Sequence, residues 1–136
     1  MGFQVPSFQM ALKRQVEIEF HGTVPTLGYL TVSAGPITYK FRIINVKLYF
    51  DQEADNLLEY RLYTSPGRLE PTGYWPADFN LFGAESPTAG FFGRSIVKEL
   101  NTGIEVGEVN QCIKFAAHNL NTYACFASAS VTLQEI

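Results

Sequence analysis

The segment from Ile37 to Phe50, ITYKFRIINVKLYF, restricts the fold of this chain more than any other stretch. Apolar and polar residues alternate along it, which is the pattern of a β-strand with one buried face. The alternation changes phase by one residue in the middle of the segment, and this predicts a β-bulge or a sharp bend within a long strand. The residues expected to face the core are Ile37, Tyr39, Phe41 and Ile43 before the change, and Ile44, Val46, Leu48 and Phe50 after it.

Further short strands are predicted on both sides of this segment. In 15–20, the apolar residues Val16, Ile18 and Phe20 alternate strictly with polar ones. Strands are also expected over 27–34, 104–109, 111–117 and 123–133, and a short strand or a turn of helix over 95–100, with turns at Gly35-Pro36 and at 101–103. Because the strands are short and do not alternate with helices, we predict an all-β, antiparallel β-sandwich or jelly roll of about seven or eight strands.

Segment 52–62 allows two interpretations. Leu58, Tyr60 and Leu62 alternate with charged residues, as in a strand. Ala54 and Leu57, together with Leu58 and Leu62, also suit the spacing of a helix. The strand is favoured because the flanking segments have β patterns.

A length of 136 residues predicts a single domain. We assign residues 12–136 to one β-sandwich domain and residues 1–11 to an extended N-terminal arm, which is too short for a stable helix. The domain has one long loop, 64–95, which holds five of the eleven glycines, four of the seven prolines and six aromatic residues. A loop of this length is usually functional or disordered, and its aromatic content favours a structured loop.

The two cysteines, Cys112 and Cys125, flank a predicted hairpin turn at 118–121. A register that places the cysteines opposite each other would separate the apolar residues of the two strands onto different faces. A register shifted by one residue brings six of them to one face, and a buried face sets register strongly. We therefore expect free thiols, with Cys125 in the core. The six residues are Ile113, Phe115, Tyr123, Cys125, Val131 and Leu133.

Charge and hydropathy argue against several classes of partner. Thirteen acids and ten bases give a net charge of −3, and Lys13-Arg14 is the only basic pair, so no nucleic-acid-binding surface is expected. No apolar run approaches the roughly 20 residues of a membrane-spanning helix, and the first residues lack the features of a signal peptide. We expect synthesis in the cytoplasm without a signal peptide and no membrane contact, with later inclusion in an extracellular virus particle left open.

The residues with catalytic potential do not form a recognisable catalytic set. His21 and His118 are expected at strand ends or turns, where a histidine is usually a rim residue. The sequence has no phosphate-binding glycine loop and no nucleophile elbow. We expect that the protein is not an enzyme, and no catalytic residue or cofactor is assigned.

Asp51, Glu53 and Asp55 have the alternate spacing that begins a calcium-binding loop. Asn56 and Leu62 stand where an EF-hand requires glycine and glutamate, so the EF-hand interpretation fails. No metal is assigned, and a single calcium ion at the three acids is the alternative to a solvated acidic turn.

The aromatic residues of the long loop are the candidate site residues. They have three alternative roles: covering one end of the core, forming a platform for a carbohydrate or another small ligand, or contacting other subunits. Tryptophan and tyrosine are favoured at interface centres because they bury a large area at a low entropic cost. The loop residues are Tyr74, Trp75, Phe79, Phe82, Phe91 and Phe92, and the arm adds the candidate contacts Phe3, Val5, Phe8 and Met10.

Low charge, many aromatic residues, an arm and a long loop together favour a non-enzymatic structural subunit of a symmetric assembly. By analogy of fold alone, we expect a virus or phage virion component, namely a head decoration or cement protein, a capsid protein or a tail protein. The expected partners are further copies of the chain, with a trimer favoured, and a larger protein shell. The alternative is a carbohydrate- or small-ligand-binding jelly-roll module that uses Tyr74 and Trp75.

Overall fold

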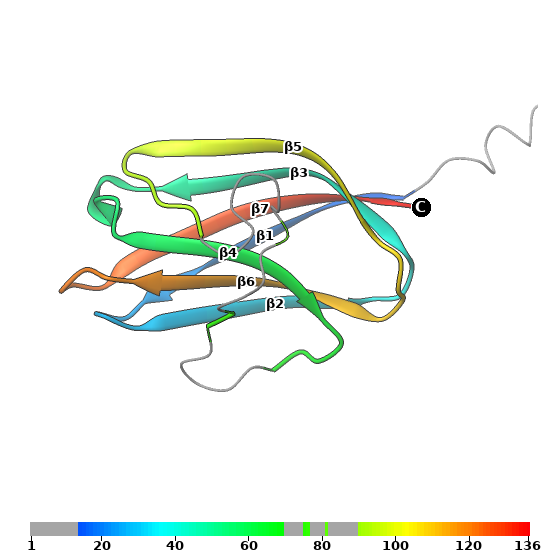
Figure 1. The fold of residues 1–136 in the computed structure, drawn as a ribbon, viewed down its shortest axis with the longest axis horizontal. Helices are drawn as coiled ribbons and strands as arrows, with labels where there is room; N and C mark the ends of the chain where they lie inside the picture. Colours follow the sequence, from blue (N-terminus) through cyan, green and yellow to red (C-terminus); the bar gives the residue numbers. More distant parts are fainter. Residues whose placement is uncertain (1–13, 70–74, 77–80, 82–89) are drawn as a thin grey trace, which may run out of the picture.

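The computed structural model describes residues 14–69, 75–76, 81 and 90–136 of the chain. Within these residues, seven strands form two antiparallel sheets that pack face to face, which confirms the predicted all-β sandwich (Figure 1). The four-stranded sheet has the order β1 (Gln15–Val24), β7 (Cys125–Glu135), β3 (Phe41–Phe50) and β5 (Ile96–Val106). The three-stranded sheet has the order β2 (Tyr29–Ile37), β6 (Gln111–Asn119) and β4 (Leu58–Ser65).

The strands pair in a nested order. β1 pairs with β7, β2 with β6 and β3 with β5, while β3 also pairs with β7 and β4 with β6. Consecutive strands therefore lie in opposite sheets, and each connection between them passes from one sheet to the other. The β1–β2, β3–β4 and β6–β7 connections and the start of β5 gather at one end of the sandwich, at the left of Figure 1, and the C-terminus lies at the other end.

The predicted phase change is a β-bulge in the middle of β3. The registers of β3 with β7 and with β5 both shift between Ile43 and Asn45, so Ile44 has no partner on either side and is only partly buried. On β5 the shift is taken up by Thr102 and Gly103, and the Thr102 hydroxyl donates a hydrogen bond of 2.6 Å to the Ile43 carbonyl oxygen. The predicted turn at 101–103 is therefore wrong, because these residues accommodate the bulge and β5 continues through them.

Two other predicted reversals are also wrong. Gly35 and Pro36 lie inside β2, where the register with β6 shifts, and Gly35 has a φ of 114°, which favours glycine. The chain reverses instead at 38–40. The predicted hairpin between 111–117 and 123–133 does not form, because β6 and β7 belong to different sheets.

The competing interpretations of 52–62 each describe a part of the segment. A short 3₁₀ helix, η1, covers Gln52–Ala54, and β4 begins at Leu58, as the favoured strand interpretation predicts. Asp55 and Asn56 have positive φ angles of 49° and 59° and separate the two elements. Since this conformation interrupts both periodicities, a single helix or strand cannot cover the segment.

The core lies between the two sheets and contains the inward residues of every strand. Cys125 is buried there and both cysteines are free, as predicted. Tyr60 of β4 crosses the core and links the two sheets: its hydroxyl donates to the Tyr49 carbonyl oxygen at 2.8 Å and accepts the Ser128 amide at 3.3 Å. Tyr49 and Ser128 form the last pair between β3 and β7, so the Tyr60 hydroxyl contacts the ladder where that pairing ends.

The arm residues Phe3, Val5, Phe8 and Met10 and the loop residues Tyr74, Phe79 and Phe82 lie outside the described residues. In the part of the chain that the structure describes, no helix has the length and apolar content that a membrane crossing requires.

Candidate functional site

Trp75 lies on the outer face of the three-stranded sheet, in contact with three strands. Its ring is 5.9 Å from that of Tyr29 at the start of β2 and 5.4 Å from that of His118 near the end of β6. The rings of Tyr29 and His118 stack at 4.2 Å with an interplanar angle of 10°. The Arg61 guanidinium of β4 lies 4.7 Å from the centre of the Trp75 ring. We call Tyr29, Arg61, Trp75 and His118 the Trp75 cluster.

Two buried charges hold the long connection against β4. Arg61 forms an ion pair with Glu59 at 3.0 Å and donates a hydrogen bond to the Pro76 carbonyl oxygen. The Glu59 carboxylate accepts the amide of Gly90 at 2.7 Å. A Cβ atom at Gly90 would lie 2.7 Å from the Tyr60 carbonyl oxygen, so only glycine allows the backbones to approach this closely.

The chemistry of the Trp75 cluster is that of a stacking surface. Burial is the main cause that lowers the pKa of His118 below its ordinary value, with Glu59 opposing this shift and Arg61 adding to it. The imidazole is therefore neutral at pH 7 and offers Tyr29 and Trp75 a flat ring face. Trp75 and His118 are half-buried and Tyr29 is exposed, so part of the cluster faces solvent.

Of the aromatic candidates of the loop, the three that the structure describes do not all lie together. Phe91 is 5% exposed and belongs to the core, and its backbone pairs with that of Tyr60. Phe92 is partly buried next to it. Leu81 also bonds to the edge of β4, because its amide donates to the Leu62 carbonyl oxygen at 2.8 Å. Trp75, on the outer face, and Phe91, in the core, thus lie on opposite sides of this sheet.

A second surface lies at the end of the sandwich where the β1–β2, β3–β4 and β6–β7 connections meet, which we call the loop end. The buried Asn119 joins two of these connections: its side-chain amide donates to the carbonyl oxygens of Val24, Pro25 and Tyr123, and its carbonyl oxygen accepts the Asn121 amide. Asn121 is also buried and donates to the Ala54 carbonyl oxygen at 3.0 Å, which adds the third connection. The loop end is therefore a hydrogen-bonded unit.

Large apolar side chains of the loop end are exposed. Leu27 is 59% exposed, Tyr123 44%, Leu57 41% and Leu120 40%. Backbone hydrogen bonds between the connections hold these residues near one another. The Leu120 amide donates to the Leu57 carbonyl oxygen at 2.8 Å, and the Leu27 amide donates to the Asn121 carbonyl oxygen at 3.2 Å. Exposed apolar residues gathered in this way mark interaction surfaces more often than isolated ones do.

The backbone of the loop end is strained at Leu27. This residue has a φ of 52°, a conformation that is unusual for a bulky side chain and costs about 1–2 kcal/mol. Leu27 is the third residue of a turn closed by a 3.0 Å hydrogen bond from the Gly28 amide to the Pro25 carbonyl oxygen, a position that favours glycine or asparagine. A leucine that is strained and exposed contributes little to the stability of the fold.

The three acids of the calcium alternative also lie at the loop end. Asp51 precedes η1, Glu53 lies within it and Asp55 follows it, and Asp55 is 3.7 Å from Arg94. Among the described residues, no group of three histidine, cysteine or acidic side chains is placed to hold a metal ion. The acids therefore give the loop end a negative rim, which Arg94 balances in part.

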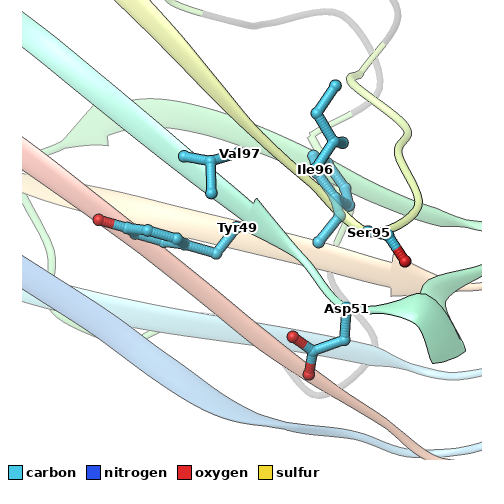
Figure 2. A pocket seen from close by; sticks show the side chains of 6 residues that line it. Tyr49, Asp51, Ser95, Ile96 and Val97 are labelled. Carbon is cyan, nitrogen blue, oxygen red and sulfur yellow. The ribbon is translucent and has the colours of Figure 1, made fainter.

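A shallow hollow of about 210 Å³ lies beside the loop end, between β3 and β5. Figure 2 shows the side chains of Tyr49, Asp51, Ser95, Ile96 and Val97 around it. Ser95 has a positive φ of 49°, and its amide donates to the Asp51 carbonyl oxygen at 3.3 Å. The exposed Ile96 and Val97 extend the apolar surface of the loop end onto the edge of the four-stranded sheet.

Sequence reasoning did not identify the four apolar residues of the loop end. Leu27 and Tyr123 were expected to begin the strands 27–34 and 123–133, Leu57 lies in segment 52–62, and Leu120 lies in the predicted turn 118–121. The available signal was that each of these large apolar residues directly follows an Asn or Thr, but only the packing of three separate connections places them at one end.

No protein family model matches the chain, and no curated protein sequence is significantly similar to it.

Proposed function

We propose that this protein is a non-enzymatic structural subunit of a symmetric protein assembly and that the loop end is its contact surface. The observation on which the proposal rests is the exposure of Leu27, Leu57, Leu120 and Tyr123 on connections that are held rigidly by Asn119 and Asn121. Rigid apolar surfaces bind at a low entropic cost because few side chains and no loops have to be ordered.

The strand order supports a jelly roll as the finer description of the sandwich. A jelly roll has eight strands that pair in a nested order, first with last and so inward. The order β1-β7-β3-β5 and β2-β6-β4 equals that arrangement without its fifth strand, which would lie beside β4. The long β4–β5 connection takes this place in the chain, and its residues Leu81 and Phe91 bond to the β4 edge.

Jelly rolls occur in viral capsid proteins and in lectins. Since fold does not determine function, this fold only makes a virus or phage particle a suitable setting for the assembly, as a decoration, cement, capsid or tail subunit. The loop end favours the assembly over the lectin alternative, because its exposed residues are mainly aliphatic, and aliphatic side chains offer no ring face on which a sugar can stack.

The native mass of the purified chain, measured by sedimentation over a range of concentrations, tests the proposal. We expect a closed oligomer, with a trimer favoured, and its loss in the double variant Leu27→Asn/Leu120→Gln. Leu69→Gln is the matched control, since Leu69 is 91% exposed but lies outside the loop end. A wild-type chain that stays monomeric at all concentrations, or a loop-end variant that associates as the control does, would contradict the proposal.

The Trp75 cluster supports carbohydrate binding as a second candidate function. Tyr29 presents an exposed ring that is already stacked on His118, so a sugar face could bind it without new ordering of the ring. A glycan array with wild type and Tyr29→Ala tests this, with Tyr123→Ala as a control because Tyr123 is also exposed but belongs to the loop end. Binding that is equal in wild type and Tyr29→Ala, or absent from wild type, would contradict it.

A further inference from the structure

The loop end has an unequal charge balance that limits what can bind there. Its connections contain Asp51, Glu53 and Asp55 but only one base, Arg94, which lies near Asp55. A symmetric contact between two loop ends would bring these acids together, and like charges in an interface are unfavourable. The loop end therefore fits a partner segment that is apolar and positively charged.

The N-terminal arm of this chain has that composition. Residues 1–16 contain no acid, and the apolar residues Phe3, Val5, Phe8 and Met10 precede Lys13. The next residue, Arg14, forms an ion pair with Glu135 of its own molecule at 2.9 Å. The arm and Lys13 thus offer apolar side chains for the exposed leucines of the loop end, one positive charge for its acidic rim, and no acid that this rim would repel. Such complementarity favours one partner and orientation over others.

The point where the arm joins the sandwich shows which copy of the loop end its residues can reach. The arm joins the sandwich at Arg14, just before β1, while the other end of β1 leads into the loop end (Figure 1). From Gln15 to Val24 the strand spans nine residue steps, or about 30 Å. Arg14 is therefore about one strand length away from the loop end of its own molecule.

The arm is too short to place all four of its apolar residues on that surface, because only Phe3 and Val5, eleven and nine residues before Arg14, could span the length of β1. Met10 is four residues before Arg14 and reaches at most about 14 Å from it, and Phe8 reaches about 21 Å. Both values are below the length of β1, so neither residue reaches the loop end of the same chain. The loop end of a second copy has no such restriction.

We propose that the arm of one copy, residues 1–11, binds the loop end of the next copy, so that the subunits associate head to tail. This inference rests on the proposed function and adds to it the segment that the loop end binds. A head-to-tail contact joins two different surfaces and closes into a ring when its rotation permits, so a trimer of this kind has three identical contacts.

A mixing experiment with two full-length variants tests the inference. The arm variant Phe3→Ser/Phe8→Ser/Met10→Ser retains the loop end, and the loop-end variant Leu27→Asn/Leu120→Gln retains the arm. Each variant alone lacks one half of every contact, so we expect each to sediment as a monomer where wild type forms oligomers. In a 1:1 mixture, the intact arm and the intact loop end form one contact per pair, and we expect dimers without larger species.

The outcomes separate this inference from the proposed function. Dimers in the mixture support the arm as the occupant. An arm variant that associates like wild type, or a mixture that remains monomeric up to concentrations about 10⁴-fold above those at which wild type assembles, overturns the inference, since ring closure adds at most about 10⁴ to affinity. If the loop-end variant is then still monomeric, the proposed function stands and another segment of the partner fills the surface. A monomeric wild type overturns both.

The synthetic peptide of residues 1–13 provides an independent readout. Labelled at its C-terminus, it should show increased fluorescence anisotropy with the arm variant, because that variant has an empty loop end. The same peptide should not bind the loop-end variant, and a scrambled peptide of equal composition is the control. Equal binding of the peptide to both variants would overturn the inference.

Discussion

The backbone strain at Leu27 leads to a quantitative prediction. Leu27→Asn and Leu27→Ala both remove most of the apolar surface of the leucine, but only asparagine is well tolerated at a φ of 52°. The difference in stability between the two variants therefore reports the backbone conformation rather than lost burial. A left-handed conformation costs a residue with a Cβ atom about 1–2 kcal/mol, and asparagine avoids a part of this cost, so the Asn variant should be about 1 kcal/mol more stable than the Ala variant.

The differences in unfolding free energy between each variant and wild type are expected to be of similar size or smaller. Leu27 is 59% exposed, so the buried part of its side chain contributes about 0.6–1.2 kcal/mol, less than half of a fully buried leucine. Relief of strain in the Asn variant offsets this loss, and its unfolding free energy should lie within about 1 kcal/mol of wild type. The Ala variant keeps the strain and should be less stable than wild type by roughly that buried contribution.

Urea and thermal unfolding followed by circular dichroism measure these differences. About 1 kcal/mol corresponds to roughly 4 °C in Tm for a chain of this length. The measurement belongs at concentrations where the monomer dominates, because association itself raises apparent stability. Leu120→Asn and Leu120→Ala serve as a control pair, since Leu120 is similarly exposed but is not among the residues with positive φ.

Two results would refute this reasoning. If the Leu27 variants with alanine and asparagine are equally stable, the turn does not strain the leucine. If the asparagine variant is stable but forms the same oligomers as wild type, Leu27 does not act in the contact, and the strain has no explanation in association.

Three further predictions concern the interior and the outer face of the three-stranded sheet. Tyr60→Phe removes the hydroxyl that links the two sheets and should lower the unfolding free energy by about 1–3 kcal/mol in urea titrations; an unchanged midpoint would mean that the link is not needed. Asn119→Asp places a carboxylate against three carbonyl oxygens, so it should be strongly destabilising at pH 7 and less so at pH 4, where a carboxyl with a raised pKa is protonated; equal losses at both pH values would argue against this cause. His118 has a lowered pKa in the folded state, so the unfolded state binds more protons below about pH 6.5 and stability falls as pH decreases through the folded pKa. His118→Gln should reduce this fall in Tm between pH 7.5 and 5, with His21→Gln as the control for removal of an imidazole, and an identical fall in wild type and His118→Gln would contradict it.

The alternation of apolar residues predicted most of the side chains that face the core, although Val16, which was also expected there, is 39% exposed. Phe20, Phe41, Val46 and Leu48 are buried as their spacing indicates, and the phase change after Ile43 is a bulge. Five of the six residues expected on one face of 111–133 are buried, and Tyr123 is the exception. These features are local, since side chains alternate across a strand whatever its neighbours are.

The position of Trp75 and the composition of the loop end were beyond prediction from the sequence. Trp75 was recognised as a site candidate, but its contacts with Tyr29, Arg61 and His118 depend on three strands that are distant in sequence. In the same way, the exposure of Leu27, Leu57 and Leu120 follows from connections that meet through Asn119 and Asn121. A turn segment has no periodicity that reveals which of its side chains will be covered.

The sequence determined that the chain forms short antiparallel strands around one apolar core. It also determined the position of the bulge in β3 and the side of most strands that is buried. Only the tertiary structure decided that β6 and β7 face each other across the core instead of pairing as a hairpin. The inward residues of both sheets face the same core, so alternation is identical for strands that pair and for strands that oppose each other. The choice was made by long-range contacts, such as the hydrogen bonds of Asn119 and Asn121 that carry the chain from one sheet to the other.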